Sequence, residues 1–230
     1  ISLYERNIIQ STGNMLHLFG FGFARDKGVL DSMQRQNIEK IGYASGTCLF
    51  TSQITLKKVG LLDTFLFLYH DDLDLGWRAA QLGISSYYVS NATIFHAESY
   101  SLKWSSRKFF WLERNRQYCL LTHYSKDTYQ KMSSSLFLVN IMVWLIYISK
   151  GFITSKIKAD LEIKRNKKLI EEKQIELEHK KIVPDEDLFE LMPNDIFVPR
   201  NISNKISSKI FNMIISYLSR TAKQRILSNK

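Results

Sequence analysis

The order of apolar and polar positions divides the chain into a first part of alternating strands and helices and a second, mostly helical part. In the first part, short aromatic and apolar runs predict buried strands, and apolar residues at helical spacing predict helices. The expected strands are IGYASGTCLFTS (41–52) and ISSYYVSNATIFHA (84–97), and the expected helices are 52–60, 71–83 and 105–125. Because strands and helices alternate, we expect an α/β fold for residues 1–130.

Local signals define several of the expected ends and loops. Ser52 is a suitable N-cap and Gly60 a suitable C-cap for the helix at 52–60. GFGFARDKG (20–28) is expected to be a loop, and LLDTFLFLY (61–69) a loop or an extended segment. The glycines of 20–28 do not form a dinucleotide-binding fingerprint, because no strand–turn–helix context surrounds them.

The second part begins with an apolar run, LFLVNIMVWLIYI (136–148), which has 13 residues and no charge. A helix needs about 20 apolar residues to cross a bilayer. We therefore expect a core helix or a helix lying in the membrane plane, rather than a full span. Residues 155–181 follow as a helix with interspersed Glu and Lys, which is typical of a solvated surface.

The chain ends in a polar linker punctuated by proline and then a basic amphipathic helix at 204–227. One helical face of that segment carries apolar side chains, namely Ile206, Ile210, Met213, Ile214 and Leu218. Such a helix suits an anionic membrane surface, and packing against the rest of the protein is the alternative. We thus expect three regions: residues 1–130, an apolar helix within 131–153, and a charged helical tail at 154–230.

Composition narrows the partners. The formal net charge of +10 is compatible with nucleic acid, anionic lipid or phosphorylated ligands. No helix-turn-helix, zinc-finger or RNA-binding signature is present, so we do not expect nucleic acid as a partner. The two cysteines, Cys48 and Cys119, lie in apolar stretches and are expected to be buried, reduced thiols.

The acidic segment FLYHDDLDLGWRAAQLG (67–83) carries the candidate chemistry. Acidic residues favour the first turn of a helix, which accounts for one or two of Asp71, Asp72 and Asp74. It does not account for the order of motifs around them. That order comprises Ser45-Gly46, Gly60 with Leu62-Asp63, Asp71 to Arg78, Gly83, Tyr88-Val89, Ala92, His96, and RNR at 114–116.

In this series, residues 43–99 closely resemble the C-terminal half of the catalytic domain of family 2 glycosyltransferases, in the rhamnosyltransferase-like branch. The resemblance implies an incomplete GT-A fold with a mostly helical C-terminal extension, residues 1–130 being its acceptor side. It also implies transfer of a sugar, with inversion, from a nucleotide-diphospho-sugar to a hydroxyl of a glycan or lipid-linked acceptor. Asp72 matches the family's general base, which removes the proton that makes a hydroxyl a poor nucleophile. Asp71 stands where the family usually has Glu.

The resemblance also suggests residues that contact the substrates. Ser45 and Gly46 would line the acceptor side. Other candidates are Asp74, Trp77, Arg78 and Arg114, with Arg107 and Arg116 as further cations for a diphosphate. The alternatives are structural: Asp74 pairing with Arg78 at the helix start, and the arginines of 105–125 forming a solvated face.

His96 is the candidate metal ligand. The family resemblance implies a divalent cation, Mg²⁺ or Mn²⁺, that neutralises the departing pyrophosphate. The sequence around His96 reads FHAES, which differs from the family's usual His-His or His-Gly. A structural role for this histidine is the alternative.

The family's nucleotide-binding half should lie before residue 1, so we expect this chain to be the C-terminal portion of a transferase and to be inactive alone. The expected setting is synthesis of surface polysaccharide or glycan, with the protein cytoplasmic and either peripheral on the inner face of the cell membrane or anchored there. The alternative is a non-catalytic remnant or a membrane-associated interaction module.

Overall fold

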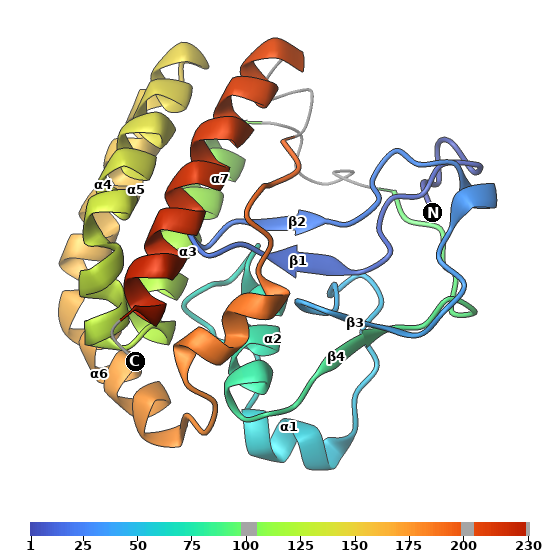
Figure 1. Cartoon of the computed structure of the whole chain (residues 1–230), viewed down its shortest axis with the longest axis horizontal. Coiled ribbons are helices and arrows are strands. Elements are labelled where there is room, and N and C mark those ends of the chain that lie inside the picture. Colours follow the sequence, from blue (N-terminus) through green and yellow to red (C-terminus); the bar gives the residue numbers. More distant parts are fainter. Residues whose placement is uncertain (98–104, 199–204, 229–230) are drawn as a thin grey trace.

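The computed structural model describes residues 1–97, 105–198 and 205–228, and it has a mixed α/β architecture. A strand-containing lobe with two short helices occupies one side, and longer helices stand together on the other (Figure 1). The chain crosses from the first lobe to the second at the start of α3 (Ser106–His123). The helical lobe thus begins with α3, which lies within the region 1–130 that was expected to form the mixed first part.

The strands of the described residues are short and pair in two small antiparallel sheets. They are β1 (Asn14–Leu16) with β2 (Gly22–Ala24), and β3 (Glu39–Ile41) with β4 (Ser86–Tyr88). Asn14 is opposite Ala24 in the first sheet, and Ile41 is opposite Ser86 in the second. A bridge between Asn14 and Tyr43 links the two sheets, with N–O distances of 3.2 and 3.1 Å.

The two expected strands are only partly present. The expected strand at 41–52 overlaps β3 at Ile41 alone, and the rest of the segment is irregular. A turn in which the Cys48 amide donates to the Ser45 carbonyl, at 3.0 Å, ends any extended course there. The strand expected at 84–97 is reduced to β4, and the loop expected at 20–28 contains β2. The apolar content of 41–52 thus predicted more strand than the structure has. Leu49 and Phe50, for example, are exposed and do not lie in a buried strand.

The helices of the first lobe follow the expectation. Helix α1 (Gln53–Val59) is capped by Ser52, whose Oγ accepts from the Thr55 amide at 3.0 Å. Gly60, with φ of 90°, ends the helix, and its amide donates to the Leu56 carbonyl at 2.8 Å. Helix α2 (Asp71–Gln81) starts at the acidic pair.

Helix α2 is seated directly on the segment that follows β3. A Cβ added to Gly76 would lie 2.3 Å from the Cβ of Tyr43, which is far inside van der Waals contact. Only glycine permits this approach at position 76. The contact fixes the start of α2 relative to residues 43–46.

Five α-helices, α3 to α7, form the second lobe in the described residues. After α3 come α4 (Lys126–Ser149), α5 (Ile153–Arg165), α6 (Lys167–Lys180) and, following the 3-10 helix η2 (Asp185–Leu191), α7 (Lys205–Leu227). Helix α3 packs mainly on α5 and α6, and α4 packs on α7. The single charged helix expected at 155–181 is in fact two, because the helical course is interrupted at Asn166.

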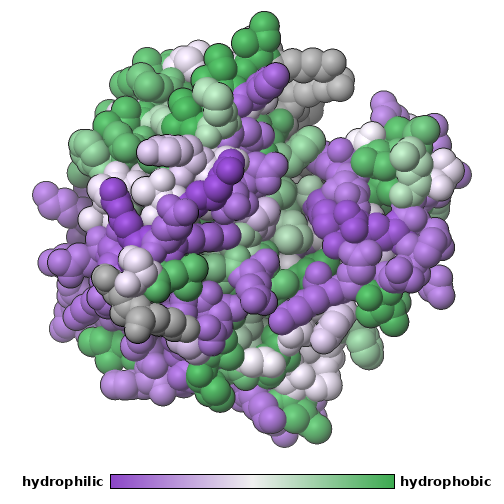
Figure 2. Space-filling view, in the orientation of Figure 1, coloured by the Kyte–Doolittle hydropathy of each residue, from purple (hydrophilic) through white to green (hydrophobic). Residues whose placement is uncertain are grey.

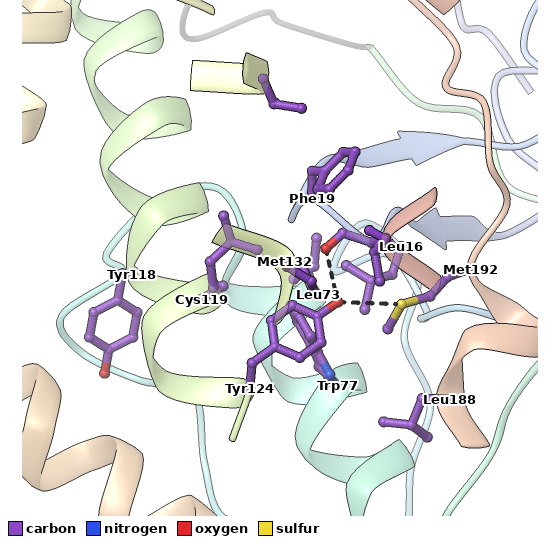
Figure 3. Packing of buried hydrophobic residues seen from close by; sticks show 14 of the residues in the cluster. Leu16, Phe19, Leu73, Trp77, Tyr118, Cys119, Tyr124, Met132, Leu188 and Met192 are labelled. Atoms are coloured by element: carbon purple, nitrogen blue, oxygen red, sulfur yellow. Dashed lines mark hydrogen bonds between the residues drawn. The ribbon is translucent and has the colours of Figure 1, made fainter. Parts of the chain in front are cut away.

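Aromatic side chains join the two lobes in one core (Figure 3). Trp77 of α2 lies edge-on to Tyr124, with ring centroids 4.9 Å apart. The Tyr124 hydroxyl donates to the Leu18 carbonyl at 2.9 Å and lies 3.6 Å from the Met192 sulfur. Because Leu18, Tyr124 and Met192 come from distant parts of the chain, this cluster ties the first lobe to the helices.

Helix α4 contains the apolar run and has two different faces. Val139, Val143 and Tyr147 are buried in the core, whereas Leu145 and Ile148 are exposed. At 24 residues α4 is long and apolar enough to cross a membrane by length and composition, and 33% of its most apolar window is buried in the protein. A core helix of a soluble protein passes the same test, and α4 is a core helix on one face.

Helix α7 also divides its apolar residues between two environments. Ile215, Leu218 and Ala222 are buried, and they give the packing that was one of the two expectations for this helix. Ile206 and Ile210, which were expected on the same apolar face as Leu218, are exposed. The first half of α7 therefore keeps an uncovered apolar side.

Candidate active site

A large cleft, of about 1090 Å³, lies between the first lobe and α3, α4 and α7. Its walls include β1, β2, the irregular segment after β3, the start of α2, β4 and one side of α3. Six sequence-predicted site residues line it, namely Ser45, Gly46, Asp71, Asp72, His96 and Arg116. The fold therefore brings these six to one cleft.

Asp72 lies half-buried at the first turn of α2, on the cleft wall. Its Oδ2 accepts from the Gly46 amide at 3.0 Å, and its Oδ1 accepts from the Leu73 amide at 2.8 Å. Burial raises the pKa of the Asp72 carboxyl, and the nearby Asp71 carboxylate adds to the rise, while the Gly46 hydrogen bond opposes it. Each oxygen keeps a lone pair, so the group remains able to accept a proton.

The loop before α2 has an uncommon backbone. Phe67, Tyr69 and His70 have φ of 57°, 65° and 63°, in the left-handed region that non-glycine residues rarely adopt. His70 is half-buried, its Nε2 lies 3.3 Å from the Gly20 carbonyl oxygen, and loss of solvent around the ring lowers its pKa to about 4. Strained backbone of this kind persists only where surrounding contacts hold it, and it is frequent at functional sites.

Asn115 of α3 supplies those contacts. Its Nδ2 lies 3.0, 2.8 and 2.6 Å from the carbonyl oxygens of Leu66, Leu68 and Tyr69. The side chain is fully buried, so the three carbonyls have little access to water as a substitute partner. Asn115 thus fixes the loop that delivers Asp71 and Asp72 to the cleft.

Arg114 braces the same loop and does not line the cleft. Its Nη2 donates to the Phe65 carbonyl and, at 3.1 Å, to the Leu66 carbonyl, and its Nη1 pairs with Glu162 at 3.0 Å. The guanidinium lies over the ring of Trp111 at 4.3 Å. The structure therefore places this candidate substrate contact in the framework behind the site. Arg107 is exposed and also lies off the cleft.

Asp74, two residues after Asp72, is completely buried and does not line the cleft. Its Oδ2 accepts from Arg78 Nε at 2.9 Å and Nη2 at 2.6 Å, and its Oδ1 lies 2.9 Å from His123 Nε2. Burial alone would raise the pKa of Asp74, but His123 and Arg78 outweigh it and hold the pKa below its usual value. The expected alternative, a pair between Asp74 and Arg78, is confirmed.

Trp77 and Arg78 belong to the same buried framework. Arg78 also donates from Nη1 to the Val59 carbonyl at 2.6 Å and from Nη2 to the Leu61 carbonyl at 2.9 Å, which anchors the end of α1. Trp77 stacks on the His123 ring with centroids 4.5 Å apart and planes at 5°. Neither side chain lines the cleft.

Ser45 and Gly46 form the turn opposite Asp72. The Ser45 hydroxyl lies 3.2 Å from the Thr47 hydroxyl and accepts from the Thr47 amide at 3.3 Å. A Cβ at Gly46 would meet the Asp72 Cβ only at 3.7 Å, which is an ordinary contact. In the structure Gly46 acts through its backbone amide, which donates a hydrogen bond to the Asp72 carboxylate.

His96 lies on the cleft rim, where its backbone pairs with the first residues of the chain. Its amide donates to the Ile1 carbonyl at 3.0 Å, and its carbonyl accepts from the Leu3 amide at 3.0 Å. Within the described residues, no three His, Cys, Asp or Glu side chains gather closely enough to hold a metal ion. The described residues therefore provide no complete ligand set, and the divalent cation stays a prediction.

A charged stretch of α3, which the motif comparison did not single out as a whole, lines the cleft beyond the acidic pair. Lys108, Glu113 and Arg116 contribute to this wall. Arg116 and Glu113 form a bidentate pair with both N–O distances at 2.8 Å, and Arg116 Nη1 donates to the Phe19 carbonyl at 3.1 Å. The spacing of Glu113 and Arg116, three residues apart on a helix, was the available sequence signal.

The two cysteines differ from each other. Cys119 is buried and free, as expected, and burial raises its pKa. Cys48 is also free but exposed, so the expectation that it is buried was wrong. The turn at Ser45 carries it out of the core to the cleft wall.

Over 61 residues the chain is 36% identical to N-acetylglucosaminyl-diphospho-decaprenol L-rhamnosyltransferase of Mycobacterium tuberculosis, in strain CDC 1551 / Oshkosh and in strain ATCC 25618 / H37Rv. The matched region is 26% of this chain, and the chain spans about a fifth (20%) of the length of these curated relatives. No protein-family model matches the chain, and no solved structure matches it significantly. The partial similarity supports a relationship to glycosyltransferases.

Proposed function

We propose that this chain is the acceptor-side portion of an inverting family 2 glycosyltransferase of GT-A fold, with Asp72 as the general base. The observation that carries the proposal is the Asp72 carboxylate itself, which is half-buried on the wall of the large cleft and held by the Gly46 amide. A carboxylate with a raised pKa binds a proton more readily, which suits it to deprotonate an acceptor hydroxyl.

In this proposal the residues around Asp72 have separate tasks. The Gly46 amide orients the carboxylate, and Asp71 strengthens its basicity through charge repulsion. The acceptor hydroxyl approaches Asp72 from the cleft and loses its proton as it attacks the anomeric carbon of a nucleotide-diphospho-sugar. Attack from the face opposite the leaving group inverts the configuration at that carbon.

The donor's nucleotide contacts are proposed to come from chain outside these 230 residues. The same holds for most ligands of a Mg²⁺ or Mn²⁺ ion, to which His96 would contribute one nitrogen. Such an ion supplies charge neutralisation at the departing diphosphate. The proposed acceptor is a hydroxyl of a glycan or of a lipid-linked sugar in surface-polysaccharide synthesis.

The experiment is substitution of Asp72 in the enzyme that carries this chain. Asp72→Asn keeps the shape of the side chain, and its one amide oxygen keeps the hydrogen bond from Gly46 at the expense of the one from Leu73. It cannot take the proton, so we expect transfer to fall by about 10²- to 10⁴-fold. Binding of the nucleotide-sugar should stay within a few-fold of wild type. Asp127→Asn, on the exposed start of α4, is the control and should transfer normally. Undiminished transfer by Asp72→Asn would refute the base assignment, and an inactive wild type would favour a non-catalytic module.

We also propose that the protein lies on the anionic inner face of the cell membrane. Exposed apolar residues of α4 and of the first half of α7, among them Leu145, Ile148 and Ile210, support this, together with the net charge of +10. Flotation with anionic vesicles tests it. The double variant Leu145→Glu/Ile210→Glu should no longer float, whereas Ile175→Glu, on the exposed side of α6, should float like wild type.

A further inference from the structure

A second cavity, of about 340 Å³, lies between the end of α1, the end of α2 and the second half of α6. We call it the basic cavity. In the described residues it shares only Val59 with the walls of the active-site cleft, so the two are separate sites. Ligand pockets run from about 300 to 1,000 Å³, and the basic cavity therefore suits a small molecule rather than a polymer.

Cations outnumber carboxylates on the walls of the basic cavity. The carboxylates are Asp63 and Glu176, and the cations are Lys57, Lys58, Arg78, Lys173, Lys180 and Lys181. Such a wall is complementary to an anion, provided that neighbouring acids do not already neutralise it.

Acids outside the cavity neutralise only two of the six cations. Arg78 pairs with Asp74, at an N–O distance of 2.6 Å. Lys181 pairs with Glu178 at 2.6 Å and with Asp185 at 3.1 Å. Four lysines then face two carboxylates, and four less two leaves a surplus of two positive charges.

The two carboxylates in the cavity cannot serve all four lysines. Glu176 is shared, since its oxygens lie 3.0 Å from Lys173 Nζ and 2.6 Å from Lys180 Nζ. Hydrogen bonds from Lys180 and Lys173 hold the pKa of Glu176 below its ordinary value. Lys57 and Lys58 are exposed, and neither forms an ion pair within the part of the chain that the structure describes. These two lysines are available to a ligand.

Arg78 adds a fixed donor to the cavity wall. It is more than nine-tenths buried, and four of its N–H groups donate to Asp74 and to the carbonyls of Val59 and Leu61. A guanidinium has five such groups, and the fifth, on Nη1, has no acceptor among the described residues. Gly60 lies beside it, since a Cβ there would be 3.2 Å from Nη1. The missing side chain at Gly60 thus leaves space next to this donor.

The basic cavity and the exposed apolar surface lie at different ends of the molecule. Figure 1 places α1 and α6 at the lower side. In Figure 2 hydrophobic side chains gather over the upper parts of α4 and α7, which include the exposed Leu145 and Ile210. A dissolved ligand therefore reaches the basic cavity more readily than the headgroup of a lipid in a membrane held by that apolar surface.

We propose that the basic cavity binds a small, soluble phosphate monoester. Its phosphate would lie against Lys57, Lys58 and the free N–H of Arg78, and two negative charges would match the surplus of two positive charges. The organic part would lie on Leu61 and Leu62, which line the cavity and are exposed. This site is distinct from the one proposed for sugar transfer and does not depend on it.

Binding by the full 230-residue chain tests the proposal without any transfer assay. The probes are glycerol 3-phosphate and glycerol, compared by isothermal titration calorimetry at pH 7.5. At that pH the phosphate carries close to two negative charges, because its second pKa is about 6. We expect saturable binding of glycerol 3-phosphate, about tenfold or more tighter than binding of glycerol. No saturable binding, or equal affinities, would overturn the proposal.

A double lysine variant locates the phosphate. Lys57→Gln/Lys58→Gln should weaken binding of glycerol 3-phosphate about tenfold. The matched control is Lys167→Gln/Lys168→Gln, which changes the net charge equally at the exposed start of α6, away from the cavity. It should bind like wild type. Equal weakening by both double variants would refute the site, because the net charge of the protein would then explain the attraction.

A carboxylate variant should act in the opposite direction. Glu176→Gln raises the positive surplus in the cavity and should tighten binding about threefold. Glu172→Gln, on the same helix but away from the cavity, is its control and should bind like wild type. A phosphate bound elsewhere, for example at Arg116 in the active-site cleft, would not distinguish these two variants, and that result would contradict the proposal.

Two further results separate the possible sources of the phosphate and the two proposed sites. Binding to vesicles that contain phosphatidate, without binding of glycerol 3-phosphate, would refute a soluble ligand and favour a lipid headgroup. Asp72→Asn should bind glycerol 3-phosphate like wild type even though sugar transfer is lost. Loss of phosphate binding in Asp72→Asn would place the ligand in the active-site cleft and overturn the inference, whereas failure of sugar transfer in the wild type would leave it standing.

Discussion

Asp72 and Asp74 stand two residues apart in the first turn of one helix, yet the protein uses them in opposite ways. Asp72 faces the cleft and receives only backbone amides, from Gly46 and Leu73. Asp74 faces the interior and is held by Arg78 and His123. Burial pushes the pKa of both carboxyls upward, and only the partners of Asp74 reverse that push.

The difference shows that burial makes a carboxylate a better base only where no cationic partner offsets the rise in its pKa. A carboxylate paired with a guanidinium and a histidine contributes to the fold but is a poor base. One that is half-buried and held by neutral amides keeps its affinity for a proton. Placing both in one turn lets the same helix start serve the framework and the chemistry.

Among the variants that test this comparison, removal of the Asp74 carboxylate should cause the largest loss of stability. Asp74→Ala leaves the buried guanidinium of Arg78 and the ring of His123 without their shared partner, so we expect unfolding free energy to fall by about 3–5 kcal/mol. Asp72→Ala should cost less than about 1 kcal/mol, since its partners are amides near solvent. Urea denaturation followed by circular dichroism measures both. Similar losses for the two variants would contradict the distinction drawn between them.

Asn115→Ala should rank next. It removes the donor shared by the carbonyls of Leu66, Leu68 and Tyr69, and we expect a loss of about 2–3 kcal/mol. The loop before Asp71 should also gain faster amide hydrogen exchange. Asn140→Ala, on α4, is a matched control and should change stability by less than about 0.5 kcal/mol. An unchanged exchange rate in residues 65–70 would show that the loop holds its shape without Asn115.

The pH dependence of stability should have opposite signs at the two carboxyls. The lowered pKa of Asp74 stabilises the fold above the ordinary value of 3.8, and this contribution is lost as pH falls through the folded-state pKa. The raised pKa of Asp72 means that its ionisation destabilises the fold as pH rises from 3.8 through the folded-state pKa.

Comparison with asparagine variants measures this directly. At pH 7, Asp74→Asn should be less stable than wild type and Asp72→Asn slightly more stable. As pH falls, the Asp72→Asn difference should disappear between the raised folded-state pKa and 3.8, whereas the Asp74→Asn difference should shrink only below 3.8. Denaturation midpoints across pH 3–7 suffice for the measurement. A stability gain for Asp74→Asn at pH 7 would reverse the assignment of the two environments.

The smallest expected effect concerns the strained loop. Phe67 has φ of 57° and an exposed side chain that touches Trp111, with ring centroids 5.5 Å apart. Because the left-handed conformation costs an L-residue roughly 1–2 kcal/mol, Phe67→Gly should be about 1 kcal/mol more stable than Phe67→Ala. Thermal unfolding of the two variants compares them at equal loss of the ring contact. Equal stabilities would mean that residue 67 is not held in the left-handed region in solution.

Much of the helical structure was predictable from sequence. Ser52 and Gly60 delimit α1 as expected, and Ser105 caps α3 through its contact with the Lys108 amide. These signals are local, since a cap involves residues within one turn. The strands were overestimated, because aromatic residues such as Phe50 favour a strand in sequence while the turn at Ser45 turns them to the surface.

The candidate site was predictable as a set of segments but not as a set of roles. Ser45, Gly46, Asp71, Asp72 and His96 do share one cleft. Arg114 and Asn115 were harder, because guanidinium and amide donors serve a phosphate and a backbone carbonyl equally well. Which acceptor they meet depends on the loop at 65–69, almost fifty positions earlier in the chain. Asp74 is likewise defined by His123, which no local pattern connects to it.

The bracing of that loop by Asn115 has a consequence for the order in which the protein is built. During synthesis the turn at Ser45, the loop at 65–70 and Asp72 leave the ribosome before Asn115, whose side chain fixes the loop. Residues 65–70 would sample many conformations until α3 emerges and docks, so the proton-accepting wall of the cleft is finished by a helix that contributes no base to it. A fragment ending before residue 105 would contain every acidic residue of the cleft wall near Gly46 and still lack their arrangement.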